Sequence, residues 1–155
     1  MAGTRRTILG IAAAVMFARA VGLAGAEPRK PMVLVPEDIQ WGPIAGAPAD
    51  VKGMDLWGNP AKGPHGAVQK FQPGFSAPLH THSNDLHVFV ISGTMITSPE
   101  GGPEKKLPAG SYIFLPSTYK HITKCDTGSE CVVLIETTGK FDVKPVEEKK
   151  PAGMK

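Results

Sequence analysis

The sequence predicts an all-β protein in a single domain, with its strands arranged as a barrel or a double-sheet jelly roll. Fifteen prolines and eighteen glycines are spread along the 155 residues, which suits short strands joined by turns and excludes long helices after the N-terminal segment. About nine to eleven short segments rich in apolar, β-branched and aromatic residues follow one another. The hydrophobic share of 41% is sufficient for one packed core.

Residues 1–26 are predicted to be a cleaved export signal. Residues 1–6 include two arginines, residues 7–18 are apolar but short for a membrane span, and Ala24-Gly25-Ala26 has the small-x-small pattern of a signal-peptidase site. Residues 4–9 resemble in part a twin-arginine signal, and an ordinary secretory signal is the alternative. Both predict a periplasmic or secreted protein with no stable membrane anchor after cleavage.

Cleavage would also remove the excess positive charge. The leader carries three of the 17 basic residues and no acidic residue, so residues 27–155 hold 14 of each sign. No cluster of lysine or arginine with interleaved aromatic residues remains, which argues against a nucleic-acid or anionic-membrane partner. A small-molecule substrate or ligand is the expected partner.

The strands expected in the first half of the domain are short. Residues 32–35, 38–41 and 54–57 are strand candidates because they are apolar or aromatic and lie between loops that contain proline or glycine. Residues 65–71 form a clearer candidate, with His65 at the start of the strand. We expect His65 to be a surface residue rather than a ligand.

Residues 74–93 hold three of the five histidines and predict half of a metal site. His80 and His82 lie two apart, and in an extended strand such residues project from the same face, so both imidazoles can reach one ion. The polar residues 83–85 predict a turn. Residues 86–91 then predict a buried strand that ends at Gly93.

After Gly93 the pattern of short strands continues. Strands are expected over residues 94–97, 112–115, 121–124 and 131–137, with a last edge strand over residues 141–143. Residues 144–155 have too little apolar content to order themselves. The predicted domain is therefore 27–143, followed by a disordered tail over 144–155.

Cys125 and Cys131 are the only two cysteines. The five residues between them look like a hairpin loop with a glycine in a turn position, which would allow cross-strand pairing of the two side chains. In an exported protein we expect a disulfide that clamps this hairpin. Two free thiols in a reducing environment are the alternative.

Two segments of the chain carry a resemblance to the cupin superfamily. Gly74-x5-His80-x-His82-x3-Leu86-x6-Gly93 resembles the first cupin motif, in which two histidines and a glutamate precede a spaced glycine. Gly110-x5-Pro116-x-Thr118-x2-His121 resembles the second motif, with Thr118 in place of a glycine. Residues 55–58 and 139–142 resemble the corresponding segments of a subgroup of small exported single-domain cupins whose activity is unassigned. The resemblance implies a cupin β-barrel, that is, a double-stranded β-helix.

The resemblance also implies a metal site. His80, His82 and His121 match the motif histidines and would hold one divalent transition metal ion, which could be Fe, Zn, Cu, Ni or Mn. The position of the motif glutamate falls on Leu86 or on His87, depending on the spacing used. Since neighbouring strand residues face opposite ways, only one of the two can face the metal. The site therefore has either three histidines, or four if a bulge turns His87 inward.

The resemblance supports a metal-dependent enzyme that acts on a small oxygenated organic molecule, by dioxygenase-like chemistry or by metal-assisted isomerisation or lysis. The alternative is a non-catalytic cupin that binds or senses a metal or small ligand. Those of Leu86, Phe89 and Ile113 that face inward would shape the pocket. Tyr119 and Glu136 are candidate bases by residue type alone. A homodimer is also compatible with the resemblance.

Overall fold

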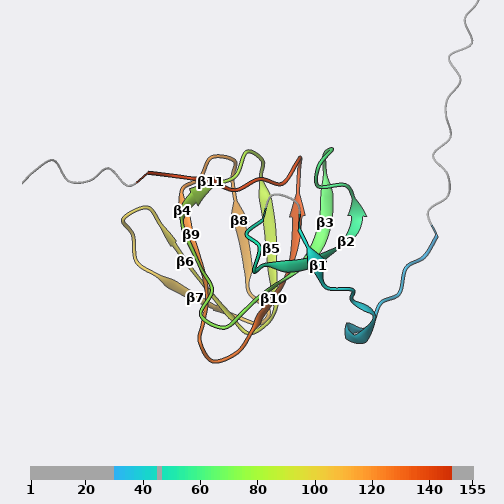
Figure 1. The fold of residues 1–155 in the computed structure, drawn as a ribbon. Coiled ribbons are helices and arrows are strands. Elements are labelled where there is room, and N and C mark those ends of the chain that lie inside the picture. The colour runs from blue at the N-terminus through green and yellow to red at the C-terminus, as the bar shows by residue number, and fades with distance from the viewer. Residues whose placement is uncertain (1–29, 45–46, 148–155) are drawn as a thin grey trace, which may run out of the picture. The chain divides into compact units, whose positions relative to one another are not determined.

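The computed structural model describes residues 30–44 and 47–147 (Figure 1). The chain divides into two units, residues 1–33 and residues 34–155, and every strand among the described residues belongs to the second unit. The predicted leader and most of the predicted tail lie outside the described residues. Within the described part of the chain, no helix is long and apolar enough to span a membrane.

Two antiparallel sheets make up the fold, which confirms the predicted all-β class (Figure 1). Sheet A has the order β1-β2-β3-β10-β5-β8, and sheet B has the order β11-β4-β9-β6-β7. The strands of sheet A are β1 (Gly42–Pro43), β2 (Lys52–Gly58), β3 (His65–Phe71), β10 (Cys131–Thr137), β5 (Leu86–Ser92) and β8 (Tyr112–Leu115). The strands of sheet B are β11 (Lys144–Pro145), β4 (Ser76–Thr81), β9 (His121–Cys125), β6 (Thr94–Pro99) and β7 (Lys105–Pro108).

The core is one cluster to which both sheets contribute. Strand β10 pairs with β3 on one side and β5 on the other, and its residues alternate between buried and half-buried along the whole strand. Val133 and Ile135 point inward from β10, and Met95 and Leu107 join them from sheet B. A period-two pattern of this kind is what a strand needs when only one of its faces is covered.

The tight β5–β6 connection depends on Gly93. This residue has a φ of +76°, and a Cβ atom here would collide with the backbone of Glu130 and Cys131. Only glycine satisfies both conditions without displacing the neighbouring loop. The spaced glycine of the first motif therefore has a steric reason, and it brings β6 into sheet B directly after β5 in sheet A.

The strands predicted at the beginning and at the end of the domain are wrong. Residues 32–35 form no strand, because Met32 and Val33 are exposed and have no pairing partner, and a single 3-10 turn, Pro36–Asp38, follows them. The strand expected over residues 38–41 is displaced to β1. Strand β7 was not among the predicted strands. The last strand is β11, not residues 141–143, and it pairs with His80 and Thr81, so the predicted tail begins in an ordered strand.

A disulfide joins Cys125 and Cys131, as expected, but it does not clamp a hairpin. Strand β9 pairs with β4 and β6 in sheet B, whereas β10 pairs with β3 and β5 in sheet A. The two strands are consecutive in the chain but share no ladder. The disulfide therefore ties the two sheets together at this end, with the Cα atoms 5.8 Å apart.

Removal of the disulfide is expected to lower the free energy of unfolding by about 2 kcal/mol, because the crosslink closes a short loop in the unfolded chain. The comparison is between wild type and the Cys125→Ser/Cys131→Ser variant in urea denaturation. Reductant should destabilise wild type to the level of the variant and leave the variant unchanged. Equal stability of wild type with and without reductant, with complete reduction verified by mass, would contradict the expectation.

Candidate metal centre

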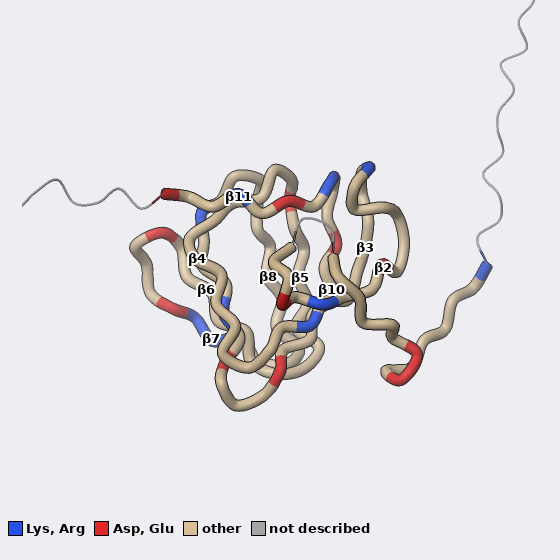
Figure 2. The backbone as a smooth tube through the Cα atoms, viewed as in Figure 1, with Lys and Arg blue, Asp and Glu red and all other residues tan. Residues whose placement is uncertain are grey.

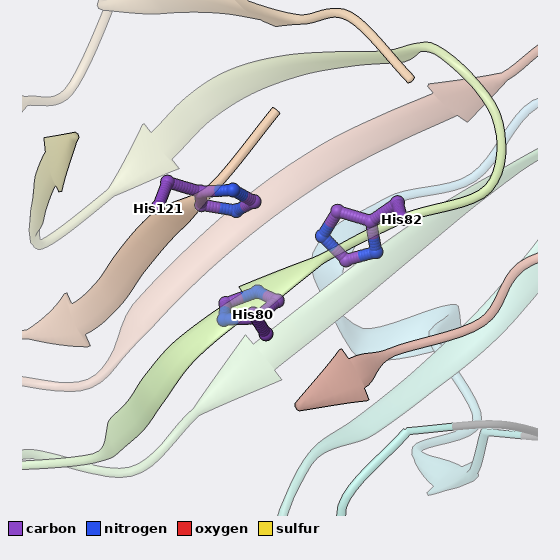
Figure 3. A group of neighbouring side chains, drawn as sticks. All are labelled: His80, His82 and His121. Carbon is purple, nitrogen blue, oxygen red and sulfur yellow. The ribbon is translucent and has the colours of Figure 1, made fainter. Parts of the chain in front are cut away.

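Three of the histidines expected to bind metal come together between the sheets. His80 on β4 and His121 on β9 are opposite each other in the strand ladder, and His82 follows the end of β4 (Figure 3). Their ring centroids lie 4.2 to 5.2 Å apart, and one nitrogen from each ring lies within 4.8 Å of the other two. All three side chains are buried. The structure thus joins the two motif segments in one cluster.

A β-bulge in β4 sets the direction of these side chains. Ala77 pairs with Thr123 and His80 pairs with His121, so two residues of β4, Pro78 and Leu79, stand opposite one residue of β9. The extra residue reverses the alternation. Ala77 and His80 are an odd number apart, yet both line the same cavity. The spacing of His80 and His82 predicted that their side chains project from the same face. The bulge before them was not predictable from the sequence.

Hydrogen bonds to backbone carbonyls orient all three rings. The Nδ1 atoms of His80, His82 and His121 lie 2.7, 2.6 and 3.0 Å from the carbonyl oxygens of Pro78, Asp142 and Tyr119, respectively. A carbonyl oxygen only accepts, so each Nδ1 carries the proton and donates it. Each Nε2 is then the free lone pair of a neutral imidazole. In metal sites, a backbone partner at one ring nitrogen fixes the tautomer and leaves the other for the metal.

Burial keeps the imidazoles neutral. Desolvation lowers the pKa of His80 and of His82 below 6.5, although the bonds to Pro78 and Asp142 act in the opposite direction. The pKa of His121 falls to about 4 because burial, aided by the neighbouring His80 and His82, outweighs the bond to the Tyr119 carbonyl. A neutral imidazole is the form that binds a metal ion. Near pH 7 the cluster is therefore in its ligating form.

The segment after β10 holds His82 from outside. Asp142 accepts hydrogen bonds from the Ser83 amide at 2.8 Å and from the Ser83 hydroxyl at 2.6 Å, while its carbonyl binds His82. Burial alone would raise the pKa of the Asp142 carboxyl, but the two hydrogen bonds from Ser83, with the charge of Lys144, lower it overall. The carboxylate thus remains charged and keeps its two bonds.

The turn before His121 carries backbone strain. Thr118 has a φ of +63° and is the one non-glycine residue with positive φ among the described residues. Its position is that of the glycine in the second cupin motif, and a β-branched residue is disfavoured in this conformation. The Thr118 amide donates to the His82 carbonyl at 2.8 Å, and the next residue supplies the carbonyl that binds His121. The strained turn therefore links two of the three clustered histidines.

Leu86, not His87, faces the cluster. Leu86 is buried and lines the same cavity as the three histidines. The pairing of β5 with both neighbours runs without a shift through these two positions, so no bulge turns His87 inward. The His87 ring instead lies tilted against Phe114 and stacks on Tyr112, and its Nδ1 lies 2.7 Å from the Tyr112 hydroxyl. The four-histidine arrangement considered from the sequence is not the one found.

The other candidate residues predicted from the sequence lie outside the cluster. His65 is buried, whereas we expected a surface residue, and its Nδ1 lies 3.0 Å from the Gly63 carbonyl. Tyr119 is 41% exposed and stacks on His121, but it does not line the cavity. Glu136 also does not line it, and Phe89 is 44% exposed on the outer side of β5. Of the apolar residues proposed to shape the pocket, Leu86 and Ile113 do so.

The three histidines lie in a cavity with apolar walls. Aromatic and aliphatic side chains from both sheets form most of its lining, including Phe71, Phe75, Met95, Val133 and Phe141. Its polar lining residues are the three histidines with Gln69, Thr97 and Thr123. Gln69 was missed in the sequence, where a single glutamine in a strand carries no pattern. Among the described residues no carboxylate, lysine or tyrosine lines the cavity.

The cluster fits a divalent transition metal ion. The Nε2 atom of His121 is buried and has no hydrogen-bond partner, which is costly unless something else uses its lone pair. Three convergent, neutral imidazoles form a donor set typical of such ions. A metal would give the orphaned nitrogen a partner and would use the lone pairs of all three closely packed rings.

The two sheets and the histidine cluster define a protein of cupin-like fold with a candidate three-histidine metal centre. Over residues 32–155 the chain matches the family described as Domain of unknown function (DUF4437), and it belongs to that family. No curated protein matches the chain in sequence.

Solved structures share the fold at low sequence identity. The polyketide cyclase RemF from Streptomyces resistomycificus has a TM-score of 0.63 and 19% identity, covering 78% of this chain and 89% of its own. An RmlC-like cupin from Shewanella frigidimarina NCIMB 400 has a TM-score of 0.53 and 21% identity, covering 70% and 92%. The DMSP lyase DddQ from Ruegeria pomeroyi DSS-3 has a TM-score of 0.53 and 22% identity, covering 74% and 63%. These likenesses establish the cupin fold.

Metal-free protein is expected to lose stability as the pH falls from about 6.5 to about 4. In this interval the unfolded His121 side chain is protonated while the folded one is not, so the unfolded state binds more protons and is favoured. Between pH 7.5 and pH 5, His121 alone should cost roughly 2 kcal/mol of stability. Urea denaturation with chelator at the two pH values measures this loss.

The matched controls are His121→Asn and His87→Asn. The first should reduce the pH dependence by the share of His121, and the second should leave it as in wild type, because His87 lies outside the cluster. An unchanged slope in His121→Asn would show that this imidazole is not held neutral.

Proposed function

We propose that the protein binds one divalent transition metal ion through the Nε2 atoms of His80, His82 and His121. The observation that carries this proposal is the convergence of three neutral rings whose Nδ1 atoms are all occupied by carbonyls. The orphaned Nε2 of His121 supports it further. Because Leu86 replaces a carboxylate ligand, the donor set is uncharged, and it suits Fe, Zn, Cu, Ni or Mn to differing degrees.

On this basis the protein is a metal-dependent enzyme that acts on a small oxygenated organic molecule. Three protein ligands leave open positions on the ion, as catalytic rather than structural sites do. When bound, the metal would act as a Lewis acid toward substrate oxygens, in dioxygenase-like or in isomerase- or lyase-type chemistry. The chain's own contribution is to hold the imidazoles, to enclose the substrate in apolar walls and to exclude water.

A non-catalytic binding or sensing role is the second candidate. It is favoured by the absence of a carboxylate, lysine or tyrosine from the described cavity lining, since proton transfer ordinarily needs such a group. Among proteins with this fold, RemF is a polyketide cyclase and DddQ is a DMSP lyase, so the barrel hosts enzymes. A shared fold does not decide between the two roles, which depend on the site.

Export to the periplasm or the medium is part of the proposal. It is supported by the leader pattern of residues 1–26 and by the disulfide, because disulfides persist in oxidising compartments. Lysine and acidic residues are interspersed along the described backbone without a large cluster of one sign (Figure 2), which supports a small-molecule partner over nucleic acid. Aromatic residues half-exposed on β5 and β8 support a homodimer, which sedimentation velocity would test.

Purified protein reloaded with Zn²⁺ is expected to hold about one ion per chain, with Zn–N distances of about 2.0–2.1 Å. The His80→Ala/His121→Ala variant should lose the ion, because it removes two of three ligands, while His87→Ala should keep it. Plasma emission spectrometry after dialysis measures the metal content. Equal metal content in wild type and in the double variant would refute the site.

Iron-loaded wild type is expected to consume oxygen, faster than free iron does, with at least one compound from a panel of β-diketones, thiols and phenolics. The His80→Ala/His121→Ala variant treated in the same way is the matched control. The binding role is supported instead if the protein holds its metal but converts no compound of the panel. Conversion here means either oxygen uptake or non-oxidative lysis or isomerisation of the compound.

A further inference from the structure

We infer that Gln69 binds the end of the substrate remote from the metal, and that the substrate is a largely apolar molecule with a hydroxyl or carbonyl group at that end. This inference rests on the proposed metal-binding function and deepens it. It places a second polar contact on the cavity wall opposite the histidines.

The position of Gln69 is fixed by its ladder partners. It lies on β3, opposite Gly53 of β2 and Val133 of β10, in the middle of sheet A. His80 and His121 lie in sheet B, and all of these side chains except Gly53 line one cavity. A molecule that fills the cavity from the histidines to sheet A therefore meets Gln69 at its other end.

The Gln69 side chain is polar, buried and without a protein partner. Its residue exposure is 2%, and no hydrogen bond joins its amide to another described residue. The amide atoms still face the open space of the cavity, because His121 Nε2 is the one fully enclosed side-chain polar atom without a partner among the described residues. An amide that faces an apolar cavity is costly unless water or a ligand binds it. A methionine or leucine would fill the same volume among the apolar neighbours Phe71 and Val133 at no such cost. A glutamine here is explained if something that enters the cavity binds its amide.

The rest of the lining limits what can enter. The three histidines are neutral and no charged side chain lines the described cavity, so a polyanionic substrate would have only the metal to neutralise it. Phe71, Phe75 and Phe141 offer flat apolar surface to the body of a ligand. The Gln69 amide both donates and accepts hydrogen bonds, which suits an uncharged hydroxyl or carbonyl group.

The test compares Gln69→Met with Gln72→Met, the second being an exposed glutamine close in sequence. Both variants and wild type are loaded with Co²⁺, and metal content is measured first. Benzohydroxamate, which combines a metal-binding head with an apolar ring, is then titrated and followed by the visible Co²⁺ absorption. Its 3-hydroxy and 4-hydroxy analogues add a hydroxyl at the far end of the ring.

We expect wild type and both variants to hold equal cobalt. At least one hydroxylated analogue should bind wild type more tightly than the parent compound and lose about tenfold in affinity in Gln69→Met. The parent compound should bind all three proteins within about twofold. Gln69→Met should not lower the Tm of the ligand-free protein, because it removes no hydrogen bond to another described residue.

Three results would overturn the inference alone while the metal site stands. They are cobalt retention with no hydroxamate binding, equal loss of affinity for all three compounds in Gln69→Met, and a lowered Tm in Gln69→Met, which would identify a structural amide. If Gln69→Met does not fold, Gln69→Leu replaces it, and failure of both identifies a structural role. If wild type takes up no cobalt, the proposed function fails and this inference fails with it.

Discussion

The hydrogen bond between each clustered imidazole and a backbone carbonyl is the interaction on which the site depends. With the Nδ1 atoms of His80, His82 and His121 all donating, three lone pairs remain on the Nε2 atoms of rings whose centroids lie 4.2 to 5.2 Å apart. Water or a side-chain hydroxyl in place of these carbonyls could donate as well as accept, and would not fix the tautomer. Backbone partners therefore convert a group of buried histidines into a set of ligands prepared for an ion.

Three local features of the fold near the cluster each position one of these hydrogen bonds. The bulge in β4 brings His80 inward and leaves the Pro78 carbonyl within its reach. Asp142 is held by Ser83, so its carbonyl stays against His82. The turn at Thr118 is strained, and its cost is tolerated where it presents a carbonyl to His121. The other strands of the two sheets supply the frame, and the disulfide joins the two sheets at one end.

The central strands were predictable from the sequence because their information is local. The bounds of β3, β8 and β10 follow directly from short runs rich in apolar residues that are bounded by turn residues. Strands β1, β7 and β11 are short and exist through their partners, which a local pattern does not contain. The motif histidines were predictable by resemblance, and the choice between Leu86 and His87 was open until the unshifted pairing of β5 was known. The role inferred for Gln69 could not be predicted from the sequence, because it depends on the position of Gln69 across the cavity from the histidines.

The most direct test of the metal centre is a long-range ¹H–¹⁵N correlation spectrum of the histidine rings in metal-free protein at pH 7, repeated after addition of Zn²⁺. We predict that His80, His82 and His121 are neutral with the proton on Nδ1, and that Zn²⁺ shifts the Nε2 resonances of these three rings but not that of His87. A proton on Nε2 of any of the three rings, or Nε2 resonances unmoved by the metal, would contradict a prepared three-histidine site.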